Sequence, residues 1–119
     1  MGHVLVVDDD AGIRQVLQAF LVDEGYQVSV AENGLEAIAR LAQEPGLLVL
    51  LDLMMPVLDG AGVISWLQAT PGPTRHKLVL MTATRHQAQE QDWLETGVIQ
   101  AVVHKPFDIE EVLTILGQL

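Results

Sequence analysis

Short apolar runs alternate with longer amphipathic stretches along the whole chain. The runs are rich in β-branched residues or leucine and stop at polar or turn-forming residues, which is typical of strands. One run, at residues 47–51, is apolar at every position, as expected of a strand covered on both faces. The segment at 28–30 alternates with polar residues and predicts a half-exposed strand. The predicted strands are residues 4–7, 28–30, 47–51, 78–81 and 102–103.

The stretches between these runs carry apolar residues at three- and four-residue spacing, which predicts helices with one buried face. Asp10 is placed to cap the first helix, and Gly25 follows its end. The side chains expected to face the core are Ile13, Leu17, Phe20 and Leu21; Leu35, Ile38, Leu41 and Ala42; and Val63, Ile64 and Leu67. A polar helix at about 87–96 turns Trp93 and Leu94 inward, and a last helix runs from Ile109 to about Leu119.

Strand–helix alternation of this kind predicts an α/β fold, a doubly wound parallel sheet of five strands with helices on both faces. In such sheets the functional groups gather at the carboxyl ends of the strands. The residues that leave those ends are Asp8, Asp9, Asp52, Thr82 and Lys105.

Composition narrows the function classes. The 119 residues include 16 acidic and six basic side chains, for a formal charge of −10. A nucleic-acid-binding surface needs basic residues, so direct binding to DNA or RNA is not expected. The absence of cysteine excludes thiolate metal sites and thiol nucleophiles. With no basic leader and no apolar run near the ~20 residues that span a bilayer, the prediction is a single cytoplasmic domain away from membranes.

Three carboxylates are predicted to converge. Asp8 and Asp9 alone are more typical of a helix cap or a solvated loop. Asp52 changes this interpretation, because it ends a fully buried strand where an unpaired carboxylate is costly to desolvate. Carboxylates at adjacent strand ends would repel without a cation, and hard oxygen ligands favour Mg²⁺.

Thr82 and Lys105 complete the predicted chemistry. A lysine beside Asp52 is a counter-ion and a phosphate ligand, and a hydroxyl can donate to a phosphoryl oxygen. Together with the acids they predict a phosphoryl-transfer site in which a carboxylate is the nucleophile. The chain has no GxxxxGK[ST] loop and no GxGxxG after its first strand, so P-loop and dinucleotide sites are not expected.

Four segments resemble the response-regulator receiver family of two-component signalling. They are Val4-Leu5-Val6-Val7-Asp8-Asp9-Asp10, Leu51-Asp52-Leu53-Met54-Met55-Pro56 with Asp59-Gly60, Met81-Thr82-Ala83, and Lys105-Pro106-Phe107. Each is weak alone, but all four occur in order at successive strand ends. The resemblance covers residues 1–119 as one receiver domain and implies the flavodoxin-like strand order 2-1-3-4-5.

The resemblance also implies roles. Asp52 would accept a phosphoryl group from the phosphohistidine of a sensor histidine kinase or a histidine phosphotransfer protein. Asp8, Asp9, Asp52 and the backbone carbonyl of Met54 would hold Mg²⁺, and Thr82 and Lys105 would bind phosphoryl oxygens. The Lys105–Pro106 peptide would be cis. A downstream output protein or domain would read the face of the fourth helix, fifth strand and fifth helix.

The chain departs from the family at Val102, where an aromatic switch residue is common. Its last helix lacks the Arg and Lys residues of the dimerising DNA-binding subgroup. His104 is expected to be an exposed strand-end histidine. The polar helix with Gln87, Gln89, Glu90 and Gln91 is interpreted as a solvated face that partners read.

Three alternatives to a stand-alone phosphorylation switch remain. An aspartyl-phosphate phosphohydrolase is disfavoured, because its general acid would occupy the position of Met54. A pseudo-receiver is disfavoured by the complete acidic set with Thr82 and Lys105. The chain as the amino-terminal receiver of a longer transcriptional or enzymatic regulator stays open. In each signalling alternative the domain catalyses only its own phosphotransfer and dephosphorylation.

Overall fold

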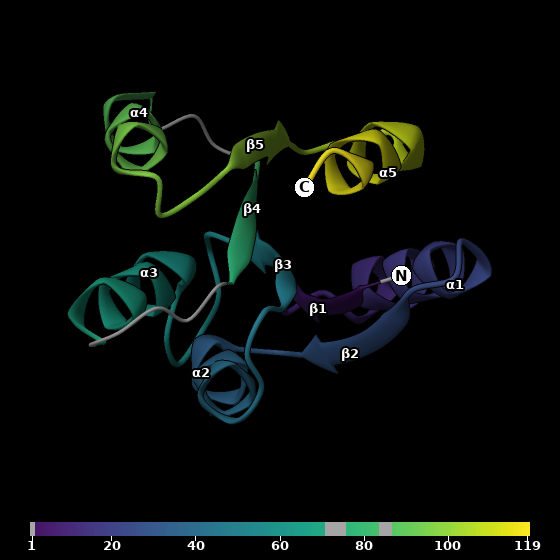
Figure 1. The fold of residues 1–119 in the computed structure, drawn as a ribbon, viewed down its shortest axis with the longest axis horizontal. Coiled ribbons are helices and arrows are strands. Elements are labelled where there is room, and N and C mark those ends of the chain that lie inside the picture. Colours follow the sequence, from purple (N-terminus) through teal and green to yellow (C-terminus); the bar gives the residue numbers. More distant parts are fainter. Residues whose placement is uncertain (1, 71–75, 84–86) are drawn as a thin grey trace.

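The computed structural model describes residues 2–70, 76–83 and 87–119. Its centre is a parallel sheet with the order β2-β1-β3-β4-β5, as the resemblance implied (Figure 1). The strands are β1 (His3–Val7), β2 (Gln27–Ala31), β3 (Leu48–Asp52), β4 (Lys77–Thr82) and β5 (Ala101–His104). Each predicted strand is present, and the order reverses beside β1, which is where such sheets place their sites.

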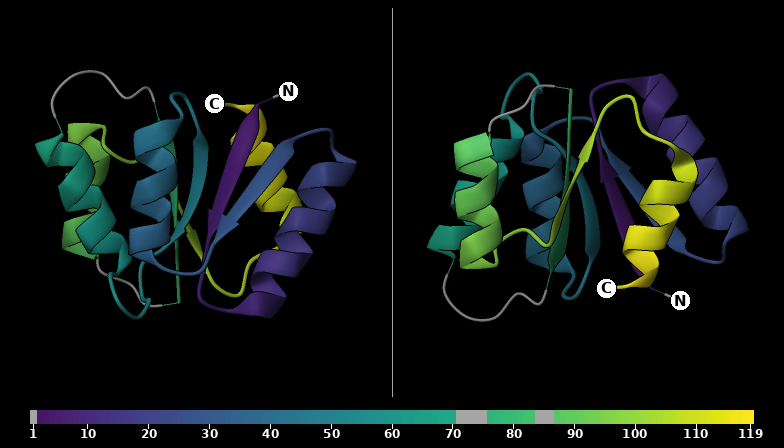
Figure 2. Two further views of the ribbon diagram at one scale, coloured as in Figure 1. Left: turned by 90° about the horizontal axis from the view of Figure 1, so that it is seen from below. Right: turned by 90° about the horizontal axis from the view of Figure 1, so that it is seen from above.

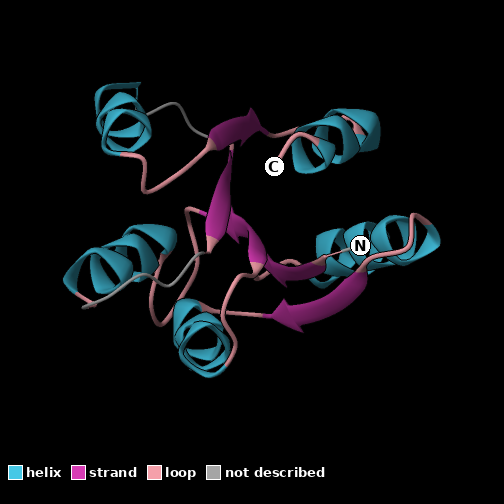
Figure 3. Cartoon of the chain, viewed as in Figure 1, coloured by secondary structure: helices cyan, strands magenta, loops and turns pink. Residues whose placement is uncertain are grey.

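Helices cover both faces of the sheet. They are α1 (Ala11–Asp23), α2 (Gly34–Gln43), α3 (Gly60–Ala69), α4 (Gln87–Thr96) and α5 (Ile109–Gly117). Viewed along the sheet, α1 and α5 lie on one side, and α2, α3 and α4 lie on the other (Figures 2 and 3). No helix among the described residues is both long and apolar enough to cross a bilayer.

Two apolar cores result from this layering, one on each face of the sheet. Successive strand residues point to opposite faces. In β3, Leu50 joins the core beneath α1 and α5, whereas Leu51 joins the core beneath α2, α3 and α4. Both are fully buried, which confirms that the apolar run of this strand is covered on both sides.

The helix ends agree with their sequence signals. The Asp10 carboxylate accepts hydrogen bonds from the amides of Gly12 and Ile13, at 2.8 and 3.2 Å, and so caps α1 as predicted. Gly25 follows α1 with a φ of 99°, and Gly97 follows α4 with a φ of 80°. These left-handed positions suit glycine because it has no Cβ.

Four expected core residues are exposed instead. Phe20, Leu35 and Leu94 are 46%, 56% and 37% exposed, and Ala42 also faces solvent. Leu17 and Leu21 are the buried row of α1, and Phe20 lies at the edge of that row. In α2 the buried residues are Gly34, Ala37 and Leu41, and Leu35 lies almost opposite Ala37 around the helix. Spacing identifies an apolar stripe, but contact with the sheet decides how much of it is buried.

The β3–α3 loop contains a strained residue. Val57 has a φ of 70° and is 72% exposed. A left-handed conformation brings the Cβ close to the following carbonyl oxygen, and a β-branched side chain tolerates it poorly. The next residue, Leu58, accepts a hydrogen bond from the Gly34 amide at 2.9 Å, which holds the loop against the start of α2.

Replacing Val57 by glycine is expected to stabilise the protein. The substitution removes the left-handed penalty of about 1–2 kcal/mol, from which the greater freedom of glycine in the unfolded chain subtracts about 0.5–1 kcal/mol. Urea unfolding should show a net gain of up to about 1.5 kcal/mol. Val22→Gly, at an exposed valine of α1, is the matched control and should destabilise by roughly 1 kcal/mol. A loss of stability in Val57→Gly would contradict strain at this position.

Candidate functional site

The strand ends bring the predicted site residues to one edge of the sheet. Asp8 follows β1, Asp52 ends β3, Thr82 ends β4 and Lys105 follows β5. The register aligns them, since Val7 pairs with Leu51, Asp52 with Met81, and Thr82 with His104. The convergence predicted from the sequence is therefore confirmed.

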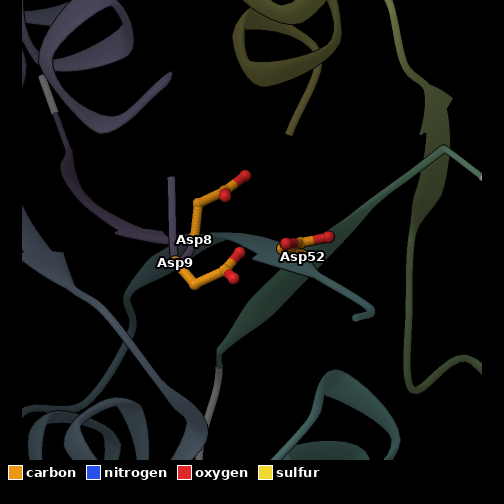
Figure 4. Close-up of side chains that lie close together, drawn as sticks. All are labelled: Asp8, Asp9 and Asp52. Carbon is orange, nitrogen blue, oxygen red and sulfur yellow. The ribbon is translucent and has the colours of Figure 1, made fainter. Parts of the chain in front are cut away.

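Asp8, Asp9 and Asp52 form a cluster of carboxylates (Figure 4). One oxygen from each lies within 4.8 Å of the others. Asp8 is fully buried and Asp52 is 4% exposed, whereas Asp9 faces solvent. Three hard oxygen donors with one open side are a suitable ligand set for a hydrated divalent cation such as Mg²⁺.

Backbone amides orient two of these acids. Asp8 Oδ1 accepts from the Asp10 amide at 2.9 Å. Asp52 Oδ1 accepts from the Met54 amide at 3.4 Å, so the chain turns back toward the acid directly after β3. The backbone carbonyl of Met54 as a metal ligand stays a prediction.

Lys105 brings a positive charge to the carboxylates. Its Nζ lies 2.7 Å from Asp8 Oδ2 and 3.5 Å from Asp52 Oδ1, and its side chain is 17% exposed. The Lys105 amide donates to the Thr82 carbonyl at 2.8 Å, which ties the lysine to the end of β4. The Lys105–Pro106 peptide is cis, as the resemblance implied. Thr82 itself is fully buried.

The surroundings of Asp52 and Lys105 raise the pKa values of both side chains. Burial, with a further contribution from the charge of Asp8, raises the pKa of Asp52 to about 6, although Lys105 and the Met54 amide act in the opposite direction. Burial lowers the pKa of Lys105, but its hydrogen bond to Asp8 and the negative charges of Asp52 and Asp8 outweigh that effect and raise it overall. At neutral pH Asp52 is therefore mostly an anion facing an ammonium group.

Two residues near the site make contacts that the sequence did not predict. Arg14 Nη1 donates to the Asp8 carbonyl at 2.6 Å, and a basic residue one turn into the helix after the acids was the available signal. His104 is half-buried rather than exposed, and its Nε2 lies 3.3 Å from Oε1 of Glu90 in α4. Glu90 is 6% exposed, so the expectation that this helix presents a wholly solvated face is wrong at that residue.

Fold and site together define an α/β protein with an acidic cluster and a lysine at the carboxyl edge of a parallel sheet. The chain belongs to the response regulator receiver domain family, whose model matches residues 4–117. It is thus a receiver domain of the kind found in two-component response regulators, a family of signalling switches.

Named relatives agree with this assignment. The chain is 39% identical over 112 residues to the uncharacterized transcriptional regulatory protein YkoG of Bacillus subtilis, covering 94% of this chain and 48% of that protein. It is 36% identical over 109 residues to sporulation initiation phosphotransferase F of the same organism, covering 92% of this chain and 86% of that protein. The chain thus spans about half the length of YkoG and most of the phosphotransferase.

A solved structure shows the same fold. The response regulator TrrA from Thermotoga maritima, in complex with Mg²⁺ and BeF, superposes with a TM-score of 0.82 at 31% identity. The superposition covers 99% of this chain and 98% of that one.

Proposed function

We propose that residues 1–119 act as one phosphoacceptor switch in which Asp52 accepts a phosphoryl group from the phosphohistidine of a sensor histidine kinase or a histidine phosphotransfer protein. The observation that carries this proposal is the position of Lys105 Nζ, within 4 Å of both Asp8 and Asp52 at the edge where the carboxylates converge. A lysine in that position neutralises charge on a group attached to Asp52 without blocking its approach from solvent.

The chemistry follows from the ionisation of Asp52. With a pKa of about 6 its carboxylate is mostly ionised at pH 7, and one oxygen can attack the phosphorus in line. The O–P bond forms as the N–P bond to the donor imidazole breaks, and that ring nitrogen takes a proton. Lys105 and the Thr82 hydroxyl then bind the phosphoryl oxygens. Mg²⁺, when bound by Asp8, Asp9, Asp52 and the Met54 carbonyl, supplies further charge neutralisation.

The domain would catalyse only its own phosphorylation and dephosphorylation. A phosphohydrolase is the weaker alternative, since the position of its general acid is held by Met54, an apolar side chain that is 60% exposed. Output would pass to a protein or domain that contacts the face of α4, β5 and α5. Because relatives such as YkoG are about twice as long and are named as transcriptional regulators, an amino-terminal receiver in a longer regulator is the main alternative to a stand-alone one. We infer a cytoplasmic location, with no direct contact to nucleic acid or membrane.

Phosphorylation by a small acyl phosphate tests the proposal. With Mg²⁺ present, intact-protein mass spectrometry should show the addition of a single phosphoryl group, and Asp52→Asn should abolish it. Asp59→Asn is the matched control, because Asp59 is an exposed acid in the loop that follows β3. Its side chain caps α3 by accepting a hydrogen bond from the Gly62 amide at 2.9 Å. Equal phosphorylation of Asp52→Asn and wild type would overturn the assignment of Asp52.

Magnesium is expected to stabilise the fold. A ligand at ten times its Kd raises the free energy of unfolding by about 1.4 kcal/mol when it binds only the native state. The thermal midpoint of wild type should therefore rise with millimolar Mg²⁺. Asp9→Ala removes one ligand and should weaken the rise, whereas Asp23→Ala, at an exposed acid far along α1, should leave it intact. A wild-type thermal midpoint that does not change with Mg²⁺ would argue against the cation site.

A further inference from the structure

A buried carboxylate lies on the sheet-facing side of α4. Glu90 is 6% exposed, as is Trp93 one turn later, while the other described side chains of the helix are exposed. Burying a carboxylate is costly unless charged or hydrogen-bonding groups compensate for the lost water. The burial of Glu90 therefore requires compensating contacts.

Glu90 meets the end of β5. Its Oε1 lies 3.3 Å from Nε2 of His104, the last residue of that strand. The pair is within ion-pair distance but outside hydrogen-bond geometry. The two elements are neighbours in the fold (Figure 1). A cleft of about 560 Å³ separates them, lined by Ala88, Glu90, Gln91, Leu94, Val102 and His104. The carboxylate–imidazole contact thus bridges a loosely filled interface.

His104 is in turn joined to the acidic site. It pairs with Thr82 in the β4–β5 register. The next residue is Lys105, whose amide donates to the Thr82 carbonyl at 2.8 Å and whose Nζ contacts Asp8 and Asp52. A displacement of Thr82 or Lys105 toward Asp52 therefore acts directly on the backbone that carries the imidazole.

We propose that Glu90 and His104 form a polar latch that sets the position of α4 according to the phosphorylation of Asp52. The inference rests on the proposed function of Asp52 and names the residues that transmit its state. A phosphoryl group adds charge and acceptor oxygens that attract Lys105 and Thr82. His104 moves with them, and Glu90 follows through its contact with the ring.

The latch takes the place of an aromatic switch at Val102. Valine has a single side-chain torsion with a strong rotamer preference, so it cannot respond by a large swing. The imidazole has two torsions and a polar edge that reaches the neighbouring helix. Glu90 is thus a positioning residue, because it acts on α4 through His104 and does not touch the phosphoryl group.

Trp93 provides a reporter for the test. It is buried one turn from Glu90, and Trp66→Phe in α3 leaves it as the single tryptophan. Mg²⁺ with fluoroberyllate, a mimic of the acyl phosphate, should change Trp93 emission in this background. Glu90→Ala and His104→Ala should each abolish most of that change. The double variant should lose no more than either single one.

Matched controls separate the latch from general damage to the helix. Glu95→Ala removes an exposed carboxylate of α4 that bonds only to Gln91 among the described contacts, at 3.1 Å, and should keep the full response. If Glu90→Ala fails to fold, His104→Ala decides the question, because its half-buried side chain leaves a smaller void. Amide exchange of α4 with and without fluoroberyllate gives a second measurement of the same response.

Mass spectrometry with acyl phosphate distinguishes the two proposals. Absence of phosphorylation in wild type would refute the function proposed for Asp52. Normal phosphorylation together with a full Trp93 response in His104→Ala and in a folded Glu90→Ala would refute the latch. Normal phosphorylation with the response lost in both variants and kept in Glu95→Ala supports it.

Discussion

Asp52→Asn is expected to make the protein more stable in Mg²⁺-free buffer at pH 8, although it abolishes phosphorylation. Burial and the Asp8 charge raise the pKa of Asp52 from 3.8 to about 6, so the ionised side chain is less favourable in the folded protein than in the unfolded chain. A difference of this size corresponds to roughly 3 kcal/mol. An amide of similar shape does not ionise, and the pKa of about 6 already includes the opposing effects of Lys105 and the Met54 amide.

The pH dependence has a definite sign. A carboxyl group whose pKa is higher in the folded state stabilises the fold fully below pH 3.8, and that contribution is lost as the pH rises through about 6. The advantage of Asp52→Asn should therefore be small at pH 4 and reach its maximum above pH 7. Urea unfolding of both proteins between pH 4 and pH 8, with a chelator present, measures this advantage.

Added Mg²⁺ should reduce the difference in unfolding free energy between Asp52→Asn and wild type, because the cation offsets the repulsion between the carboxylates of the wild-type protein. Asp59→Asn, which exchanges one good helix cap for another, should change the unfolding free energy by less than about 0.5 kcal/mol at every pH. A wild type that is more stable than Asp52→Asn at pH 8 without Mg²⁺ would show that the carboxylate is compensated by its surroundings.

Gly60→Ala is expected to damage both stability and phosphorylation. A Cβ at Gly60 would lie 2.6 Å from the Asp52 carbonyl oxygen and 2.8 Å from the Leu53 Cα. Both are backbone atoms, so neither can move aside by a side-chain rotation. The Gly60 amide also donates to the Leu53 carbonyl at 2.9 Å, which fixes the approach. We expect a loss of about 3 kcal/mol or more in urea unfolding.

The same substitution should slow phosphorylation, because relief of the clash displaces the backbone that carries Asp52. Gly117→Ala at the end of α5 is the control, since a Cβ there meets nothing within 4 Å. Its stability should be unchanged or raised by up to about 1 kcal/mol through helix propensity. If Gly60→Ala kept wild-type stability and phosphorylation, the backbone at the start of α3 would be able to move aside at little cost, contrary to this prediction.

The site was predictable because it depends on strand ends, and the apolar runs mark those ends sharply. Asp8, Asp52, Thr82 and Lys105 each follow a run that becomes a strand, and parallel pairing brings the ends together whatever the helices do. The fold class followed from the same alternation. The strand order required the resemblance of the motifs, since alternation alone does not say which strands are neighbours.

The features that the sequence did not predict depend on packing between distant segments, which no local sequence pattern indicates. The only large apolar side chains of α4 are Trp93 and Leu94, which are adjacent and define no stripe, so the burial of Glu90 had no periodic signal. Leu35 lies on an apolar stripe by spacing, but the small residues Gly34 and Ala37 are the ones against the core. The left-handed backbone of Val57 is unusual for valine and lies in a tight turn, in which the Leu58 amide donates to the Pro56 carbonyl at 2.8 Å.

The two ends of the chain lie near each other, at the end of the sheet opposite to the strand arrowheads (Figure 2). Asp52 lies at the arrowhead end, because it is the last residue of β3. Gly2 and Leu119 line one shallow pocket there, and Lys77 Nζ donates to the Leu119 carbonyl at 3.2 Å. The length of a five-residue strand, roughly 17 Å, separates the chain ends from the acids. A dye, a surface tether or a short peptide joining the two ends can therefore be attached without obstructing a phosphodonor.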